Sequence, residues 1–108
     1  MPVLKIKIRE NALIARIAAW RMRTVCVAVV VGRTIYLWNI TRNDFLGNEA
    51  WVKHEVAHVH QYSKLGIARF LFLYLMESAQ KGYLRNRFEI EAREREAEVT
   101  LLDDVVFC

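Results

Sequence analysis

Two histidines four residues apart, with a glutamate directly after the first, are the residues of this chain best suited to chemistry. They are His54, Glu55 and His58, in the pattern H-E-x-x-H. On an α-helix, residues four apart lie on one face about one turn apart, so both imidazoles can bind one zinc ion. The glutamate then lies beside the pair, where it reaches a zinc-bound water rather than the metal. The pattern therefore predicts a zinc site with Glu55 as general base.

A catalytic zinc ion usually has a third protein ligand, for which the sequence offers several candidates. The extended pattern H-E-x-x-H-x-x-G-x-x-H needs glycine at Gln61 and histidine at Lys64, so it does not supply the ligand. His60 lies about 200° round the helix from the nearer histidine and is expected to be a surface or hydrogen-bonding residue. Glu89 and Glu91 are better candidates, although each can also form an i,i+4 ion pair on an exposed helix. Helix geometry leaves the choice between them open.

The N-terminal part of the chain predicts a small β-sheet and one helix. Residues 3–8 alternate apolar and basic side chains, as a half-exposed strand does. A helix is expected from Asn11, as its cap, to about Arg23. Its apolar residues follow helical spacing: Leu13, Ile14, Ile17 and Trp20. The β-branched run 24–31 and the strand 34–40 are expected to form a hairpin.

The histidines are expected on a long helix that begins at Thr41 or Asn43 and ends at Gly66. Apolar residues form one narrow stripe of this helix, nearly opposite the histidines: Phe45, Val52, Val56 and Val59. A helix with a core-facing stripe and a histidine pair on its far side is typical of a metal-bearing active-site helix.

Two further helices and a short tail are expected after Gly66. The segment 67–80 is dense in large apolar residues and is expected to be a helix buried on most sides. A last helix, capped by Asn86, is expected from 87 to about 102. In the tail 103–108, packing of the apolar residues on the core is the simpler expectation. A second hypothesis is that an acid or the Cys108 thiolate occupies the zinc and keeps an enzyme latent.

Composition narrows the class of protein. The 108 residues are 55% hydrophobic and 26% charged, which indicates one folded domain over 1–108. The expected order of strands and helices places this domain in the α+β class. The net charge of +4 comes from basic residues scattered along the sequence, so a solvated surface is expected rather than a nucleic-acid or membrane-surface partner. The apolar stretch 67–76 contains Arg69 and is about half as long as a membrane span. Cys26 and Cys108 make no disulfide framework, which favours a reducing, cytoplasmic location.

H-E-x-x-H followed some thirty residues later by a helical glutamate resembles the gluzincin metallopeptidases. Two segments, HEVAHVHQY at 54–62 and NRFEIEAR at 86–93, resemble the minigluzincins and small proteins related to the DUF4157 group. The resemblance implies a zincin-like domain in which a backing helix and a small sheet precede the active-site helix. It also implies Glu89, the first residue of E-x-x-A, as third zinc ligand. Arg93 stands where an aspartate often orients a zinc-binding histidine, so that support is unassigned.

The motif and the resemblance together predict a zinc-dependent metallopeptidase with a peptide or protein substrate. Glu55 takes a proton from the zinc-bound water, whose pKa falls to about 7, and delivers it to the leaving amine. The strand 34–40 is expected to pair its edge with an extended peptide. Tyr62 and Tyr83 are candidates for stabilising the negative charge of the transition state, although a structural role is the simpler expectation. The alternative function is a zinc-stabilised binding protein without efficient turnover.

Overall fold

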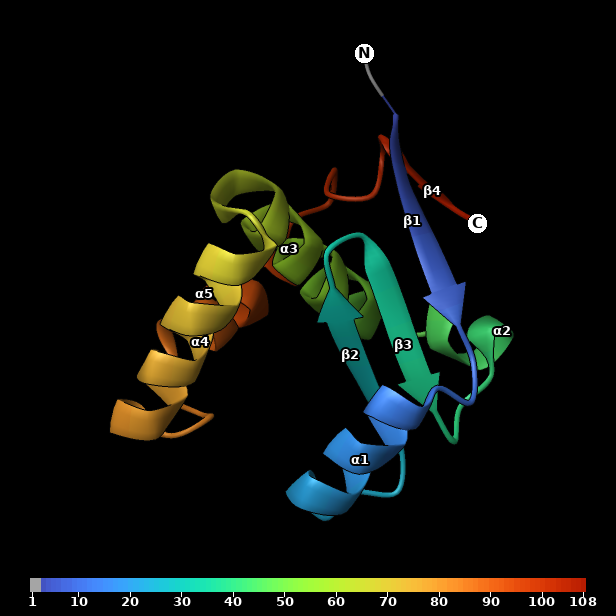
Figure 1. Cartoon of the computed structure of the whole chain (residues 1–108). Coiled ribbons are helices and arrows are strands. Elements are labelled where there is room, and N and C mark those ends of the chain that lie inside the picture. Colours follow the sequence, from blue (N-terminus) through green and yellow to red (C-terminus); the bar gives the residue numbers. More distant parts are fainter. Residues whose placement is uncertain (1–2) are drawn as a thin grey trace.

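The computed structural model describes residues 3–108 as a four-stranded mixed sheet with helices on both faces (Figure 1). The strands are β1 (Leu4–Arg9), β2 (Val27–Val31), β3 (Thr34–Trp38) and β4 (Val105–Phe107), in the order β2-β3-β1-β4. β2 and β3 are antiparallel, while β1 is parallel to both β3 and β4. The helices are α1 (Leu13–Met22), α2 (Arg42–Leu46), α3 (Glu49–Leu65), α4 (Ile67–Lys81) and α5 (Arg87–Arg95). The predicted α+β class is confirmed.

The main core lies between the sheet and α3. Alternate strand residues face this side because successive side chains of a strand point to opposite faces. They meet the predicted apolar stripe of α3, and the buried members are Ile6, Val30, Ile35, Leu37, Val52, Val56 and Val59. Full burial of one such side chain contributes roughly 1.5–3 kcal/mol. This packing fixes the rotation of α3 about its axis, so that its opposite face presents the histidines to α5.

The predicted helix over 41–66 is in fact two helices, α2 and α3, separated at Gly47 and Asn48. Asn48 leaves the helical conformation, with φ −101° and ψ 88°, and its side chain accepts a hydrogen bond from the Trp51 amide at 3.2 Å. An asparagine side chain that bonds a nearby backbone amide competes with the helix, which explains the break. Thr41, one of the two predicted caps, does cap a helix. Its side chain accepts a hydrogen bond from the Asp44 amide at 3.1 Å, at the start of α2.

Both α1 and α4 expose large apolar residues, although the helix 67–80 was expected to be buried on most sides. In α1 only Ala15 and Ala19 are buried, because small side chains allow the helix to lie close to β2, while Trp20 is 79% exposed. In α4 only Phe70 is buried. The expected cap of α1 is also wrong, since Asn11 has φ 53° and lies one residue before the actual N-cap. No helix within residues 3–108 is both long and apolar enough to cross a membrane.

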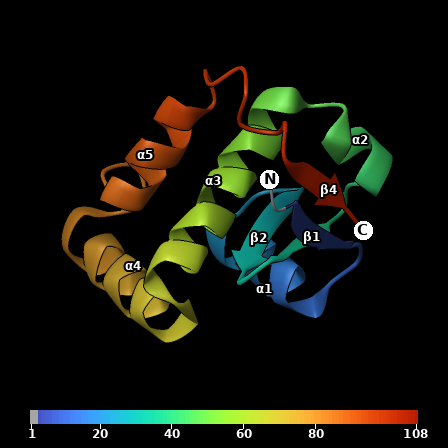
Figure 2. The ribbon, with the colours of Figure 1, turned by 90° about the horizontal axis from the view of Figure 1, so that it is seen from above.

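The C-terminal segment confirms one expectation, because Val105 and Phe107 of the tail pack against the core, but it differs from expectation in two other ways. α5 ends at Arg95 rather than near residue 102, and the amides of residues 96–98 donate to carbonyls three residues earlier as the helix unwinds. The tail then forms β4 beside β1, where the Cys108 amide donates to the Ile6 carbonyl at 2.8 Å. Arg42 further holds it by donating to the Phe107 carbonyl at 2.8 Å. The tail therefore belongs to the sheet, on the side of the molecule away from α4 (Figure 2).

Candidate metal centre

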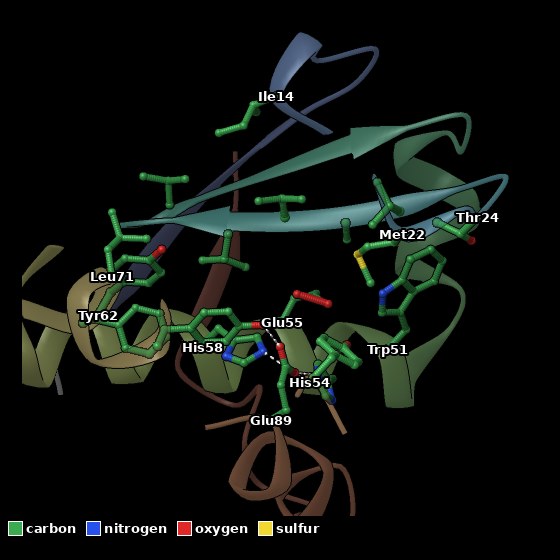
Figure 3. Close-up of a pocket in the computed structure, with 18 of the residues that line it drawn as sticks. Ile14, Met22, Thr24, Trp51, His54, Glu55, His58, Tyr62, Leu71 and Glu89 are labelled. Carbon is green, nitrogen blue, oxygen red and sulfur yellow. Dashed lines mark hydrogen bonds and ion pairs between the residues drawn. The ribbon is translucent and has the colours of Figure 1, made fainter. Parts of the chain in front are cut away.

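Two histidines of α3 and one glutamate of α5 converge between the two helices (Figure 3). The Nε2 atoms of His54 and His58 lie 2.9 and 3.0 Å from the Oε1 atom of Glu89. One potential ligand atom from each residue lies within 4.8 Å of those of the other two. The three side chains are 12%, 9% and 4% exposed. The structure thus brings together the three residues that the sequence analysis selected as ligands.

The donor set can be compared with what zinc requires. Two imidazole nitrogens and one carboxylate oxygen are a common ligand set for a tetrahedral zinc ion that keeps one position open. Bond lengths of about 2.0–2.2 Å place neighbouring tetrahedral ligand atoms roughly 3.3–3.5 Å apart. The observed separations of 2.9 and 3.0 Å are a few tenths of an ångström shorter, which small side-chain rotations correct. His54, His58 and Glu89 therefore fit a zinc ion.

The second nitrogen of each histidine ring has its own partner. His54 Nδ1 lies 2.8 Å from Glu96 Oε2, and His58 Nδ1 lies 2.8 Å from Gln61 Oε1. Gln61 is in turn fixed, because its Nε2 donates to the Phe88 carbonyl at 3.0 Å. Acceptors in these places hold the proton on Nδ1 and direct the Nε2 lone pair towards a metal. The support for the histidines that the sequence analysis left unassigned is thus provided by Glu96 and Gln61.

Glu89 reaches the histidines because of how α5 begins. The capping side chain of Asn86 is fully buried and accepts from the Phe88 amide at 2.9 Å. Its amide group also donates to the Tyr74 carbonyl at 3.1 Å, which ties the start of α5 to α4. The Tyr74 hydroxyl donates to the second carboxylate oxygen of Glu89. Glu91 is exposed and instead accepts a hydrogen bond from Gln61 at 3.0 Å, so the structure places Glu89 rather than Glu91 at the histidines.

Glu55 points into a groove beside the cluster, under β2 (Figure 3), and is 6% exposed. Burial raises the pKa of Glu55 to about 7, against the opposing charges of the two histidines. Burial lowers the pKa of His54, but its bond to Glu89 and the charge of Glu55 outweigh this and raise it to about 9. The pKa of Glu89 is held well below its usual range, because hydrogen bonds from both histidines outweigh its burial. A buried carboxyl whose pKa lies near neutrality is suited to proton transfer.

The groove above Glu55 has a volume of about 380 Å³ and mostly apolar walls. One wall is β2, and the other includes Phe70, Leu71 and Leu75 of α4. Within the described residues β2 is an edge strand, so one of its sides has no strand partner. The strand 34–40 was expected to pair its edge with a peptide. This prediction is wrong, because β3 lies between β2 and β1 and both of its sides are already paired.

The remaining sequence candidates lie in different surroundings. Tyr62 is 5% exposed and packs on Phe70 with ring centroids 4.2 Å apart, which indicates a structural role. Tyr83 is 44% exposed and borders both the groove and a second hollow of about 370 Å³ that Glu55 and Glu96 also line. Burial, together with the charges of Glu89 and Glu55, raises the pKa of Tyr83 to about 12, so its hydroxyl keeps its proton near neutral pH. His60 is half-buried and lies outside the cluster.

Three contributors to this site were missed by the sequence analysis: Tyr74, Gln61 and Glu96. Glu96 follows Glu89 by seven residues, which is two helical turns, so its position on the same side as Glu89 at the end of α5 was visible in the sequence. Gln61 stands one turn after His58 and was considered only as a departure from a longer motif. Tyr74 gave no signal, because it lies within an apolar run.

No protein-family model, curated protein or solved structure matches this chain. The resemblance to gluzincins therefore rests on the H-E-x-x-H motif, the downstream glutamate and the order of the elements. What the geometry defines is an α+β domain with a buried group of His54, His58 and Glu89 that could hold a metal ion.

Proposed function

We propose that this chain is a small zinc-dependent metallopeptidase. The observation that carries the proposal is the convergence of His54, His58 and Glu89 on one point, with Glu55 beside them in an open groove. Metal-binding proteins without catalysis do not need a buried carboxyl between the ligands and a groove. Here that carboxyl borders the groove next to the side of β2 on which residues 3–108 place no partner strand, and an extended peptide can add there as a further strand.

Each residue then has a defined task. A bound zinc ion supplies the Lewis acidity that activates water and polarises a peptide carbonyl. Glu55 accepts a proton from the attacking water and returns it to the leaving amine. Tyr83, the protonated hydroxyl that borders the groove, donates a hydrogen bond to the oxygen on which negative charge develops. Glu96 and Gln61 hold the two histidine rings in place through Nδ1.

The variant Glu55→Gln tests the proposal, because it removes the proton acceptor and keeps the size of the side chain. Zinc-loaded wild-type protein is expected to cleave members of a broad peptide library. Glu55→Gln is expected to lower kcat by roughly 10²–10⁴-fold with unchanged zinc content. Glu94→Gln, at an exposed position of α5, is the matched control and should retain full activity.

Failure of the proposal has a clear signature. Wild-type protein that binds one zinc ion tightly but hydrolyses no peptide in the library contradicts it. That result favours the alternative function, a zinc-stabilised binding protein whose site performs no turnover.

A further inference from the structure

Several exposed apolar residues of α1 and α4 lie outside the groove described above. We name six of them the docking face: Leu13, Ile17 and Trp20 of α1, with Phe72, Met76 and Leu84 of α4 and the loop that follows it. Each is between 44% and 79% exposed, and none lines the groove. The two helices flank the same groove and lie at one side of the molecule in both views (Figures 1 and 2). Exposed apolar surface of this extent usually marks a site of interaction.

Positive charge is concentrated on the same two segments, although the basic residues appear scattered along the sequence. Residues 11–25 and 66–86 contain six basic side chains and one acidic side chain, a net charge of +5. The rest of the chain contains ten basic and eleven acidic residues, a net charge of −1. The basic residues of these two segments are Arg16, Arg21, Arg23, Arg69, Lys81 and Arg85. The one acidic residue is Glu77.

We propose that the docking face binds the surface of an anionic lipid bilayer. Helices that carry leucine, phenylalanine and tryptophan next to arginine and lysine bury their apolar side chains at the boundary between headgroups and acyl chains. Their basic side chains meanwhile approach the lipid phosphates, which attract them over about one Debye length. Trp20 suits this boundary because its ring is apolar and its indole N–H is polar.

Two other occupants fit the observations less well. A second copy of this chain, docked face to face, would bring a net charge of +5 against another +5 and would be repelled. An apolar peptide in the groove would leave the docking face in water, because these residues lie outside the groove. A lipid surface covers the apolar side chains and complements the charge at the same time.

Docking in this way would place the mouth of the groove, between α1 and α4, at the lipid surface. The β4 edge of the sheet lies on the side of the molecule away from α4 (Figure 2). The proposal concerns binding alone and does not depend on the proposed hydrolysis, so each can fail without the other.

The test measures binding of the full, zinc-loaded chain to lipid vesicles by co-sedimentation. One set of vesicles is phosphatidylcholine alone, and the other contains phosphatidylserine as well. Trp20→Ser removes apolar surface, and its control is Val99→Ser, which is 86% exposed but lies after α5. The double variant Arg21→Glu with Arg85→Glu reverses charge at the docking face. Its control, Lys5→Glu with Lys7→Glu, reverses two exposed charges on β1.

Wild-type protein is expected to bind the anionic vesicles about tenfold or more tighter than the neutral ones, with weaker binding at higher salt. Trp20→Ser and the Arg21, Arg85 double variant should each weaken binding by about tenfold or more, and both controls should stay within about twofold. Because all substituted side chains are exposed, the melting temperatures of the variants should equal that of the wild type. If Trp20→Ser has a lower melting temperature, the double variant of Arg21 and Arg85 alone tests the proposal. Absence of vesicle binding, or equal binding by all variants, overturns the proposal. Self-association in solution that Trp20→Ser abolishes also overturns it, in favour of a second copy.

Discussion

Replacing Gln61 by leucine is expected to weaken zinc binding although Gln61 is not a ligand. Its Oε1 accepts from His58 Nδ1 at 2.8 Å, and its Nε2 donates to the Phe88 carbonyl at 3.0 Å. The residue is 5% exposed, so water cannot readily replace it. Leucine has a similar volume but no acceptor, so the His58 N–H loses its partner and the ring loses its fixed orientation.

The size of the effect follows from these contacts. A buried donor left without a partner costs about 1–3 kcal/mol of the free energy of unfolding. The Phe88 carbonyl keeps its bond within α5 and adds little. In a domain of this size each kcal/mol lowers the melting temperature by about 4–8 °C. Loss of a residue that orients a zinc-binding histidine lowers metal affinity by about 10–100-fold. Gln61→Glu keeps the acceptor for His58, so it should restore most of the affinity while its charge next to Glu91 keeps stability low.

Zinc affinity can be measured by competition with a fluorescent chelator, and stability by circular dichroism melts of the metal-free protein. Gln80→Leu, at an exposed position of α4, is the matched control and should change neither quantity. Wild-type zinc affinity in Gln61→Leu would refute the reasoning, because the ring of His58 would then need no support. Equal loss of affinity in Gln61→Leu and Gln61→Glu would refute the assigned role of the Oε1 acceptor.

Three further outcomes are expected. Asn86→Ala should lower the free energy of unfolding by about 2–4 kcal/mol in urea titrations, because the cap of α5 and the part-buried bonds to the Tyr74 carbonyl and the Ser78 hydroxyl are lost; a change under about 0.5 kcal/mol would contradict this. Tyr83→Phe should lower kcat by roughly 10²-fold with unchanged zinc content, whereas Tyr62→Phe should not; equal activity of both would remove Tyr83 from the mechanism. Without zinc, the folded protein favours protonated His54, whose pKa is raised from 6.5 to about 9, so its melting temperature should fall as pH rises through this range. Burial raises the pKa of Glu55 to about 7, which also makes the melting temperature of the zinc-free protein fall as pH rises. With zinc, which needs deprotonated ligands, the melting temperature should rise instead, and parallel slopes in the two forms would contradict the ligand assignment.

The sequence predicted best those features that local periodicity controls. The stripe of Val52, Val56 and Val59 determined which face of α3 meets the sheet, and this placed the histidines correctly. Asn86 was identified as the cap of α5, which fixes where Glu89 points. The spacing within α5 left Glu89 and Glu91 equivalent, because the choice depends on how α5 packs against α3 and α4.

Features that depend on distant contacts were harder to predict. Nothing local in the segment 105–107 shows that it pairs with β1, since strand pairing at this separation is decided by the whole fold. The order of strands likewise made β2 rather than β3 the edge. Apolar content alone suggested that α4 is buried, but whether a partner covers an apolar helix depends on elements elsewhere. The exposure of Trp20 and Phe72 is therefore information that only the structure supplies.

The central claim is that His54, His58 and Glu89 hold one zinc ion. Zinc content and affinity in Glu89→Gln, compared with Glu91→Gln, test it most directly, because both glutamates lie on α5 two residues apart. The account predicts one tightly bound zinc per chain in wild-type protein and in Glu91→Gln, and a loss of affinity of about 10²-fold or more in Glu89→Gln. Unchanged zinc binding by Glu89→Gln, or loss of zinc in Glu91→Gln alone, would contradict it.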